Sequence, residues 1–357
     1  MLSERENTLR YIDFKGPEWI PTEVDISPAM WHEHREELER IVVRHPFVFG
    51  AYEPGSVGFD DFPPTYRAGR FTDEWGCIWK NVHTGMSGIV VEHRLADWDA
   101  FDSYTPPDPL THHEHERGER PPWEEFARRA EATRRREQVV LFMADRFFER
   151  LHFLRGYENL MVDFMTGEPK VEALIEMVVE NNLRLIEKLG EFGPDVIGFG
   201  DDLGSQNALM MSPELFGKYL VPGYKRMFEA VKKCGARVYL HSDGCILEAI
   251  PHLIDCGLDA INPEAMPNTL EGIVHVMKGK LAILLNLDRQ HVIPFGTPRQ
   301  IRAHILEAVE KLYDPSGGLA LRTGLIPPVP LSNVEAVAQT FEEVMYRVAG
   351  GKQTGER

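Results

Sequence analysis

The sequence predicts an α/β fold: a (β/α)8 TIM barrel with a loop-rich N-terminal elaboration over the barrel mouth. From about residue 136 onward, short apolar runs alternate with long amphipathic segments. Alternation at this rhythm is typical of parallel strands joined by crossover helices. Six such units can be read, and the upstream chain has room for two more, which favours a barrel over an open doubly wound sheet. The glycine-rich turn of a dinucleotide-binding fold is also missing from the sequence.

Short apolar runs mark the predicted barrel strands. They are Val139–Met143, Val196–Gly198, Arg237–Leu240, Ala260–Ile261, Leu281–Leu285 and Leu319–Leu321. Apolar residues between 171 and 186 recur at spacings near 3.6, which predicts a helix with one buried face. Ser212-Pro-Glu-Leu combines a capping hydroxyl with a proline in the first turn, so a helix should start there, be interrupted near Pro222 and stop at Gly235. Thr297-Pro-Arg-Gln and Ser332-Asn333 open two further helices.

We expect one domain over residues 1–357, with 1–135 as the elaboration and 136–350 as the main barrel units. The first part holds loops rich in proline and aromatic residues, such as Tyr52-Glu-Pro-Gly, a β-like run at Gly88–Glu92 and an exposed helix over 122–137. These loops could form part of a substrate lid. The histidine-rich stretch 111–120 is interpreted as a solvated charged loop, with metal binding as the alternative.

Composition excludes several classes of partner. The 39 basic and 56 acidic residues give a net charge of −17, which argues against nucleic acid and anionic membranes as partners. Four cysteines without a CxxC pair are too few for a disulfide scaffold. The charged N-terminus and the absence of a long apolar run predict neither a signal peptide nor a membrane span, so the cytoplasm is the expected location.

Polar side chains follow five successive predicted strands. They are Asp201 and Asp202, His241 and Asp243, Asn262 and Glu264, Asn286 and Asp288, and Arg322 and Thr323. Active sites of such barrels lie at the carboxyl ends of the strands. Each residue alone could be a turn former or a helix cap, but five strand ends of this kind indicate a binding or catalytic site.

His241-Ser-Asp243 is the sharpest of these features. The two side chains are two residues apart at a strand end, so both could face the barrel mouth as ligands for a divalent metal or as an acid–base pair. The structural alternative is a histidine bonded to a neighbouring aspartate before a turn at Gly244.

A second group of candidates surrounds this pair. Adjacent carboxylates point in different directions, so at most one of Asp201 and Asp202 is expected to enter the site. The other would have a structural role, capping or bracing the neighbouring backbone. Gln206 could supply a directed amide to a substrate, or simply stabilise its loop. Glu74 and Trp75 could bring a carboxylate and an aromatic wall over the mouth, with core packing of the aromatic ring as the alternative.

Several motifs resemble the uroporphyrinogen decarboxylase superfamily. They are Gly198-Phe-Gly-Asp-Asp-Leu-Gly-Ser-Gln, Ser212-Pro-Glu-Leu-Phe-Gly-Lys-Tyr-Leu, Leu240-His-Ser-Asp-Gly, Asn262-Pro-Glu, Pro294-Phe-Gly-Thr-Pro and the loop Pro327–Pro330. The stretches Asp73-Glu-Trp-Gly and Phe147-Phe-Glu-Arg-Leu-His-Phe-Leu-Arg-Gly-Tyr-Glu-Asn look like the branch related to corrinoid-dependent methyltransferases. The resemblance implies a (β/α)8 barrel. The arginine-rich N-terminal motif of true uroporphyrinogen decarboxylases is absent, so porphyrinogen decarboxylation is not expected.

The methyltransferase branch implies a zinc ion held by a His-x-Cys pair and a distant cysteine. His241 matches the histidine, whereas Asp243 stands at the first cysteine position and Arg322 at about the second. A site of His241, Asp243 and Glu264 would be harder, although it could still hold zinc or another divalent metal. A guanidinium at Arg322 would repel a cation and attract a carboxylate or phenolate, so thiol methylation is disfavoured.

These observations predict a methyltransferase that moves a methyl group from a small O- or N-methylated substrate to a corrinoid protein, with possible assistance by a metal. Asp201 or Asp202 and Gln206 would orient the substrate together with Asn262, Asn286 and Arg322, and Glu74 and Trp75 would cover it. The corrinoid would come on a partner protein, and a homodimer is plausible from the resemblance. The alternatives are a corrinoid-independent decarboxylase or lyase with Arg322 as carboxylate anchor, and a ligand-binding barrel without catalysis.

Overall fold

The computed structural model describes residues 2–50, 52–111, 114–115, 118–119 and 121–348. Half of the histidine-rich stretch 111–120 therefore lies outside the described residues. The chain forms two compact units. Unit 1 comprises Met1–Asp61 and Asn262–Arg357, and unit 2 comprises Phe62–Ile261.

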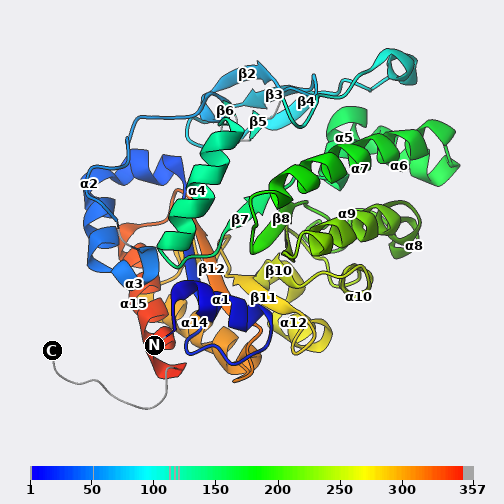
Figure 1. The fold of residues 1–357 in the computed structure, drawn as a ribbon. Coiled ribbons are helices and arrows are strands. Elements are labelled where there is room, and N and C mark those ends of the chain that lie inside the picture. The colour runs from blue at the N-terminus through cyan, green and yellow to red at the C-terminus, as the bar shows by residue number, and fades with distance from the viewer. Residues whose placement is uncertain (1, 51, 112–113, 116–117, 120, 349–357) are drawn as a thin grey trace, which may run out of the picture. The chain divides into compact units, whose positions relative to one another are not determined.

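The parallel sheet has the strand order β1-β12-β11-β10-β9-β8-β7. Figure 1 labels β7, β8, β10, β11 and β12 of this sheet. Its strands are β1 (Thr22–Ile26), β7 (Leu141–Met143), β8 (Val196–Gly200), β9 (Arg237–Ser242), β10 (Ala260–Pro263), β11 (Ala282–Asn286) and β12 (Leu319–Leu325). From β7 to β12 each strand lies beside the next in chain order, and β1 joins at β12, which is the strand order of a (β/α) barrel. The predicted α/β barrel class is confirmed, and each of the six apolar runs overlaps a strand.

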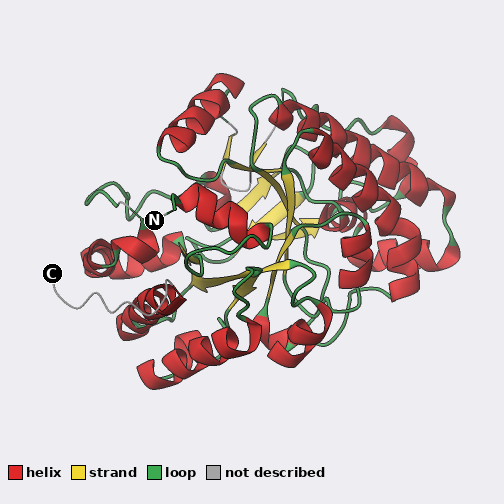
Figure 2. Ribbon diagram, turned by 60° about the horizontal axis from the view of Figure 1, so that its bottom comes forward, coloured by secondary structure: helices red, strands yellow, loops and turns green. Residues whose placement is uncertain are grey.

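The β7-β8-β9 part of the sheet belongs to unit 2. Its parallel register pairs Leu141 with Val196 and Val196 with Arg237. Helices α7 (Pro169–Gly190) and α9 (Val221–Lys233) pack against each other beside these strands, and Figure 2 shows the alternation of strands and helices. Of the apolar residues whose spacing predicted this helix, Val171, Leu174, Val178 and Ile186 are buried, and Ile175 and Leu183 are half-buried.

The helix predicted after Ser212 is interrupted, as its proline suggested. A short α8 (Pro213–Leu215) is followed by the π-helical turn η3 (Phe216–Leu220) before α9 begins. Pro222 has no N–H group to continue the α-helical hydrogen-bond ladder, which accounts for a wider turn at this point. The segment ends after Lys233, with Gly235 at a φ of 78°.

Unit 2 also contains the second part of the N-terminal region. An antiparallel sheet is formed by β2 (Gly69–Thr72), β3 (Ile78–Asn81) and β4 (Ile89–Glu92), and β5 (Glu114–His115) pairs with β6 (Gly118–Glu119). Helix α4 (Trp123–Arg135) is largely exposed and contacts the rest of the unit through Trp123 and Phe126, whose rings pack near Phe142 and Phe192. The remaining helical segments are η1 (Pro64–Tyr66), η2 (Trp98–Ser103), α5 (Phe148–Arg155), α6 (Tyr157–Thr166) and α10 (Ile250–Asp255).

Unit 1 is built on β11, β12 and β1. Its helices are α1 (Glu4–Ile12), α2 (Pro28–Arg44), α3 (Pro46–Phe49), α11 (Ala265–Asn268), α12 (Leu270–Val276), α13 (Val292–Phe295), α14 (Pro298–Leu312) and α15 (Leu331–Val348). Helix α14 starts with a capping box at Thr297 and Gln300, and α15 starts at Leu331, beside the predicted start. Within the described ranges, no helix has the length and hydropathy needed to cross a membrane.

Candidate functional site

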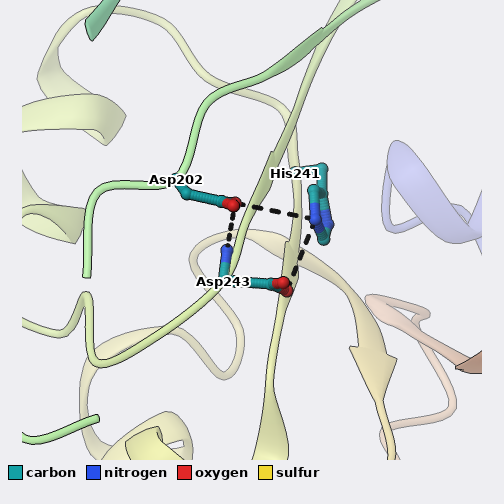
Figure 3. Close-up of side chains that lie close together, drawn as sticks. All are labelled: Asp202, His241 and Asp243. Carbon is teal, nitrogen blue, oxygen red and sulfur yellow. Dashed lines mark hydrogen bonds and ion pairs between the residues drawn. The ribbon is translucent and has the colours of Figure 1, made fainter. Parts of the chain in front are cut away.

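Three side chains converge at the ends of β8 and β9 in unit 2 (Figure 3). His241 is near the end of β9, Asp243 follows that strand, and Asp202 follows β8. His241 Nε2 lies 3.4 Å from Asp243 Oδ1 and 3.8 Å from Asp202 Oδ1. One ligand atom from each residue can be chosen so that all three lie within 4.8 Å of one another. The side chains remain 28–38% exposed, so a small ligand could reach them.

Backbone contacts between the two loops fix this arrangement. The N–H of Asp243 donates to Asp202 Oδ1 at 2.8 Å, and the N–H of Leu203 donates to Ser242 Oγ at 3.0 Å. The N–H of Cys245 donates to the carbonyl of Ser205 at 2.7 Å. The loop after β8 is therefore bonded directly to the loop after β9, and the two aspartates cannot move independently.

Asp201 has a different environment from Asp202. Its side chain is completely buried and accepts hydrogen bonds from the backbone N–H groups of Phe147, Phe148 and Glu149, and from the Tyr224 hydroxyl. Burial raises the pKa of the Asp201 carboxyl to about 6, against the opposing effect of these hydrogen bonds. Of the two adjacent carboxylates, Asp202 faces the cluster and Asp201 braces the start of α5, as expected for neighbours that point in different directions.

Helix α5 adds charged side chains that are absent from the residues predicted at the strand ends. Glu149 is buried, pairs with Arg146 and accepts a hydrogen bond from the N–H of Asp202 at 3.2 Å. Burial raises the pKa of the Glu149 carboxyl to about 8, Arg146 opposes this increase, and Asp202 and Asp201 add to it. Burial and the Arg146 charge lower the pKa of His152 to about 4. The strand-end rule points to this segment as well, because Asp145 and Arg146 come two and three residues after the predicted strand Val139–Met143.

A row of polar residues crosses the strands of unit 1. Parallel pairing places Glu264 opposite Asn286, Asn286 opposite Arg322, and Arg322 opposite Glu23. The Arg322 guanidinium lies 3.4 Å from Glu23 and 3.5 Å from Asp25, and Nη1 donates to Asn262 Oδ1 at 3.4 Å. Two carboxylates therefore already compensate the charge that was predicted to anchor a substrate.

Two further predicted residues have structural partners. Glu264 is buried and pairs with Arg289 Nε at 3.1 Å, and Asp288 caps the following turn by accepting the N–H groups of Gln290 and His291. Thr323 is buried on β12. The role of Glu264 as a metal ligand stays a prediction.

The remaining predicted substrate residues lie in unit 2. Gln206 is exposed in the loop after β8, and Glu74 is half-buried. Trp75 is buried, and the Arg150 guanidinium lies 4.8 Å from its ring centroid. Arg150 also pairs with Asp145. Trp75 thus has the core-packing contacts named as the alternative, and its part in covering a substrate stays a prediction.

The donor set of the cluster fits a divalent cation. One imidazole nitrogen and two carboxylate oxygens are ligands that zinc accepts, and the carboxylates also suit harder ions such as Mn²⁺. Two negative charges would balance the charge of the ion, and the partial exposure of the three side chains leaves room for further ligands. Cluster members come from two adjacent strand ends, which is where a barrel places its functional groups.

The sequence profile of the family named uroporphyrinogen decarboxylase (URO-D) matches residues 151–344, more than half of the chain. The chain belongs to this family. The prediction of this superfamily from the sequence is confirmed. The matched range contains Asp202, His241 and Asp243, whereas Glu149 and Trp75 lie before it.

Curated relatives of this URO-D family member are methyltransferases. Two are named methylcobamide:CoM methyltransferase MtbA: one from Methanosarcina mazei, 24% identical over 185 residues, and one from Methanosarcina acetivorans, 23% identical over 185 residues. Each alignment covers 52% of this chain and 52% of the relative, so the chain spans about half the length of the curated relatives it matches.

A solved structure of a methyltransferase from Methanosarcina mazei has the same fold. Its TM-score is 0.65 at 16% sequence identity, and the match covers 96% of this chain and 99% of that chain. This similarity extends over nearly the whole chain, beyond the residues that the family profile matches. It shows the shared fold, and the two curated relatives support the methyltransferase-like branch predicted from the sequence.

Proposed function

We propose that this URO-D family member is a metal-dependent methyltransferase that moves a methyl group from a small O- or N-methylated substrate to a corrinoid on a partner protein. The observation that carries the proposal is the convergence of Asp202, His241 and Asp243. The names of the two curated relatives add support for methyl transfer and for a corrinoid.

In this proposal Asp202, His241 and Asp243 hold the cation. A bound divalent ion would supply a Lewis acid for the heteroatom that loses the methyl group. The two carboxylates would neutralise the charge of the ion. The hydrogen bond from the Asp243 N–H to Asp202 Oδ1 holds the Asp202 carboxylate beside the backbone of Asp243. Gln206, in the loop that also carries Asp202, is a candidate for orienting the substrate.

The ligand chemistry favours oxygen or nitrogen substrates over thiols. Thiolate ligands make a metal site soft, and an imidazole with two carboxylates makes it hard. A hard site binds ether, phenolate or amine groups in preference to thiolates. We therefore propose methoxy or methylamino compounds as the substrate class.

The decarboxylase alternative receives less support. It requires Arg322 to bind a substrate carboxylate, and this guanidinium already lies near Glu23 and Asp25. A substrate carboxylate would compete with both. Arg322 and its neighbours Asn262 and Asn286 remain candidates for binding polar groups of a neutral substrate.

The test is a methyl-transfer assay on the whole chain. Protein purified without chelators is mixed with reduced cobalamin and a panel of methoxyaromatic, methylamine and methylthio compounds, and methylation of the corrinoid is followed by its absorbance. We expect activity with a methoxy or methylamine compound and its loss in His241→Ala. A variant of the exposed loop residue Asn207, Asn207→Ala, is the matched control. Activity restricted to methylthio compounds, or unchanged activity in His241→Ala, contradicts the proposal.

A further inference from the structure

Asp201 is hydrogen-bonded on one side to the start of α5 and on the other side to β9, the strand that carries the proposed metal ligand His241. Its carboxylate accepts the N–H groups of Phe148 at 2.7 Å and Glu149 at 2.8 Å, at the start of α5. Its own N–H donates to the carbonyl oxygen of His241 at 2.9 Å. One buried residue thus connects the end of β8 with α5 and with the end of β9.

The contacts of α5 continue to the neighbouring ligand. Glu149, which Asp201 holds through its N–H group, accepts a hydrogen bond from the N–H of Asp202. Asp202 in turn accepts the N–H of Asp243. The backbone N–H and the carboxylate of Asp202 are therefore both held by hydrogen bonds, in a chain that begins at the Asp201 carboxylate.

Neutralising the Asp201 side chain would disturb this chain of bonds. A carboxylate accepts several hydrogen bonds at once, and bonds to a charged acceptor are stronger than neutral ones. It also lies at the amino end of α5, where a negative charge is favourable. The amide of an asparagine would turn a donor group towards backbone N–H groups or towards the Tyr224 hydroxyl, and at least one of these donors would lose its partner.

We propose that Asp201 is a positioning residue that holds Asp202 and His241 in the geometry needed to bind the cation, and that it does not touch the cation or the substrate itself. The inference rests on the metal site of the proposed function. It adds a role for a residue with no ligand atom in the cluster, and it predicts that a change of this buried carboxylate alters the metal site.

The experiment compares Asp201→Asn with Asp163→Asn. Asp163 is the matched control because it is also a buried aspartate in unit 2, where it accepts hydrogen bonds from Arg155 and Trp98. Co²⁺ is titrated into the metal-free full-length proteins by calorimetry, and the visible absorption of bound Co²⁺ reports its ligand geometry. We expect Asp201→Asn to weaken Co²⁺ binding at least tenfold and to change the spectrum, and Asp163→Asn to change affinity less than twofold.

A second measurement does not depend on a metal. Hydrogen exchange of the metal-free proteins should be faster in Asp201→Asn for peptides covering residues 145–151, which contain the N–H donors to Asp201 and exclude Arg155, the partner of Asp163, and it should be unchanged there in Asp163→Asn. If Asp201→Asn does not fold, Tyr224→Phe removes one donor to the same carboxylate, and we expect it to weaken Co²⁺ binding severalfold.

The outcomes separate the two proposals. Wild-type affinity and an unchanged spectrum in Asp201→Asn, or in Tyr224→Phe if only that variant folds, overturn the positioning role. Equal losses in Asp201→Asn and Asp163→Asn also overturn it, because they indicate general destabilisation. If the wild-type protein binds no Co²⁺, the proposed metal site fails, and the positioning role is then judged on exchange alone. Faster exchange of residues 145–151 in Asp201→Asn alone supports it, and unchanged exchange overturns it.

Discussion

Gly204 and Gly244 face each other where the loops after β8 and β9 meet. A β-carbon on Gly244 would lie 2.1 Å from the carbonyl oxygen of Gly204, and a β-carbon on Gly204 would lie 2.5 Å from the Cys245 nitrogen. Gly244 also has a φ of 80°, a conformation that other residues adopt only with strain. The approach of the two loops, and with it the contact between Asp202 and Asp243, depends on the absence of both side chains.

We predict that Gly244→Ala separates these loops. The clash is with backbone atoms, which cannot rotate away, so the variant should lose at least about 2 kcal/mol of unfolding free energy and bind metal at least tenfold more weakly. Urea unfolding and a Co²⁺ titration measure the two effects. Gly235→Ala is the matched control, because Gly235 has a φ of 78° and a β-carbon added there would have nothing within 4 Å. Its cost should be about 1 kcal/mol, with unchanged metal affinity.

We predict that His241→Ala and Asp243→Ala each remove the bound metal. Each variant leaves two of the three ligand side chains in the cluster, and elemental analysis of protein purified without chelators should show about one equivalent of divalent metal per chain in the wild type only. His291→Ala is the control, because that side chain is 66% exposed outside the cluster. Metal retained in both site variants would contradict the assigned ligands.

We predict that Asp243→Cys shifts metal preference towards soft ions. A thiolate at this position replaces a hard oxygen ligand, so the affinity for Zn²⁺ and Cd²⁺ relative to Mn²⁺ should rise at least tenfold. Competition titrations between pairs of metals measure this ratio. Asp243→Asn, which loses the charge without gaining a thiolate, should weaken all three ions; an unchanged ratio in Asp243→Cys would mean that position 243 is not a ligand.

His152 should make the stability of the metal-free protein depend on pH. Its pKa is lowered from 6.5 to about 4, mainly by burial, so between these values the unfolded chain binds a proton that the folded chain does not. The contribution of His152 to stability is therefore gained as pH rises from 4 to 6.5 and lost as pH falls, by at most about 3 kcal/mol, whereas the raised pKa values of Glu149 and Asp201 contribute with the opposite sign. Urea unfolding at several pH values should show a smaller slope in this range for His152→Phe.

The control for this titration is an exposed histidine. His83 is exposed, so His83→Phe, which makes the same substitution outside the buried site, should change the slope less than His152→Phe. The phenylalanine at position 152 keeps an aromatic ring against Phe148 and Phe153, which His152 contacts edge-on. A slope in His152→Phe equal to that of the wild type would assign the pH dependence to other groups.

The sequence by itself determined the barrel class, its six downstream strands and the pairing of His241 with Asp243. These features depend on local patterns, namely apolar runs, helix caps, and two side chains that are two residues apart at the end of one strand. The strand-end rule also pointed to Asp202, although it left open which of the two adjacent aspartates enters the site.

Only the tertiary structure decided how the remaining groups are used. It turned Asp202 towards His241 and Asp201 towards α5, because the start of α5 supplies N–H donors to one carboxylate and leaves the other facing the β9 loop. It also places Glu149, on helix α5, next to the backbone N–H of Asp202. Contacts between residues about 40 to 50 positions apart set these roles, and no local pattern in the chain contains that information.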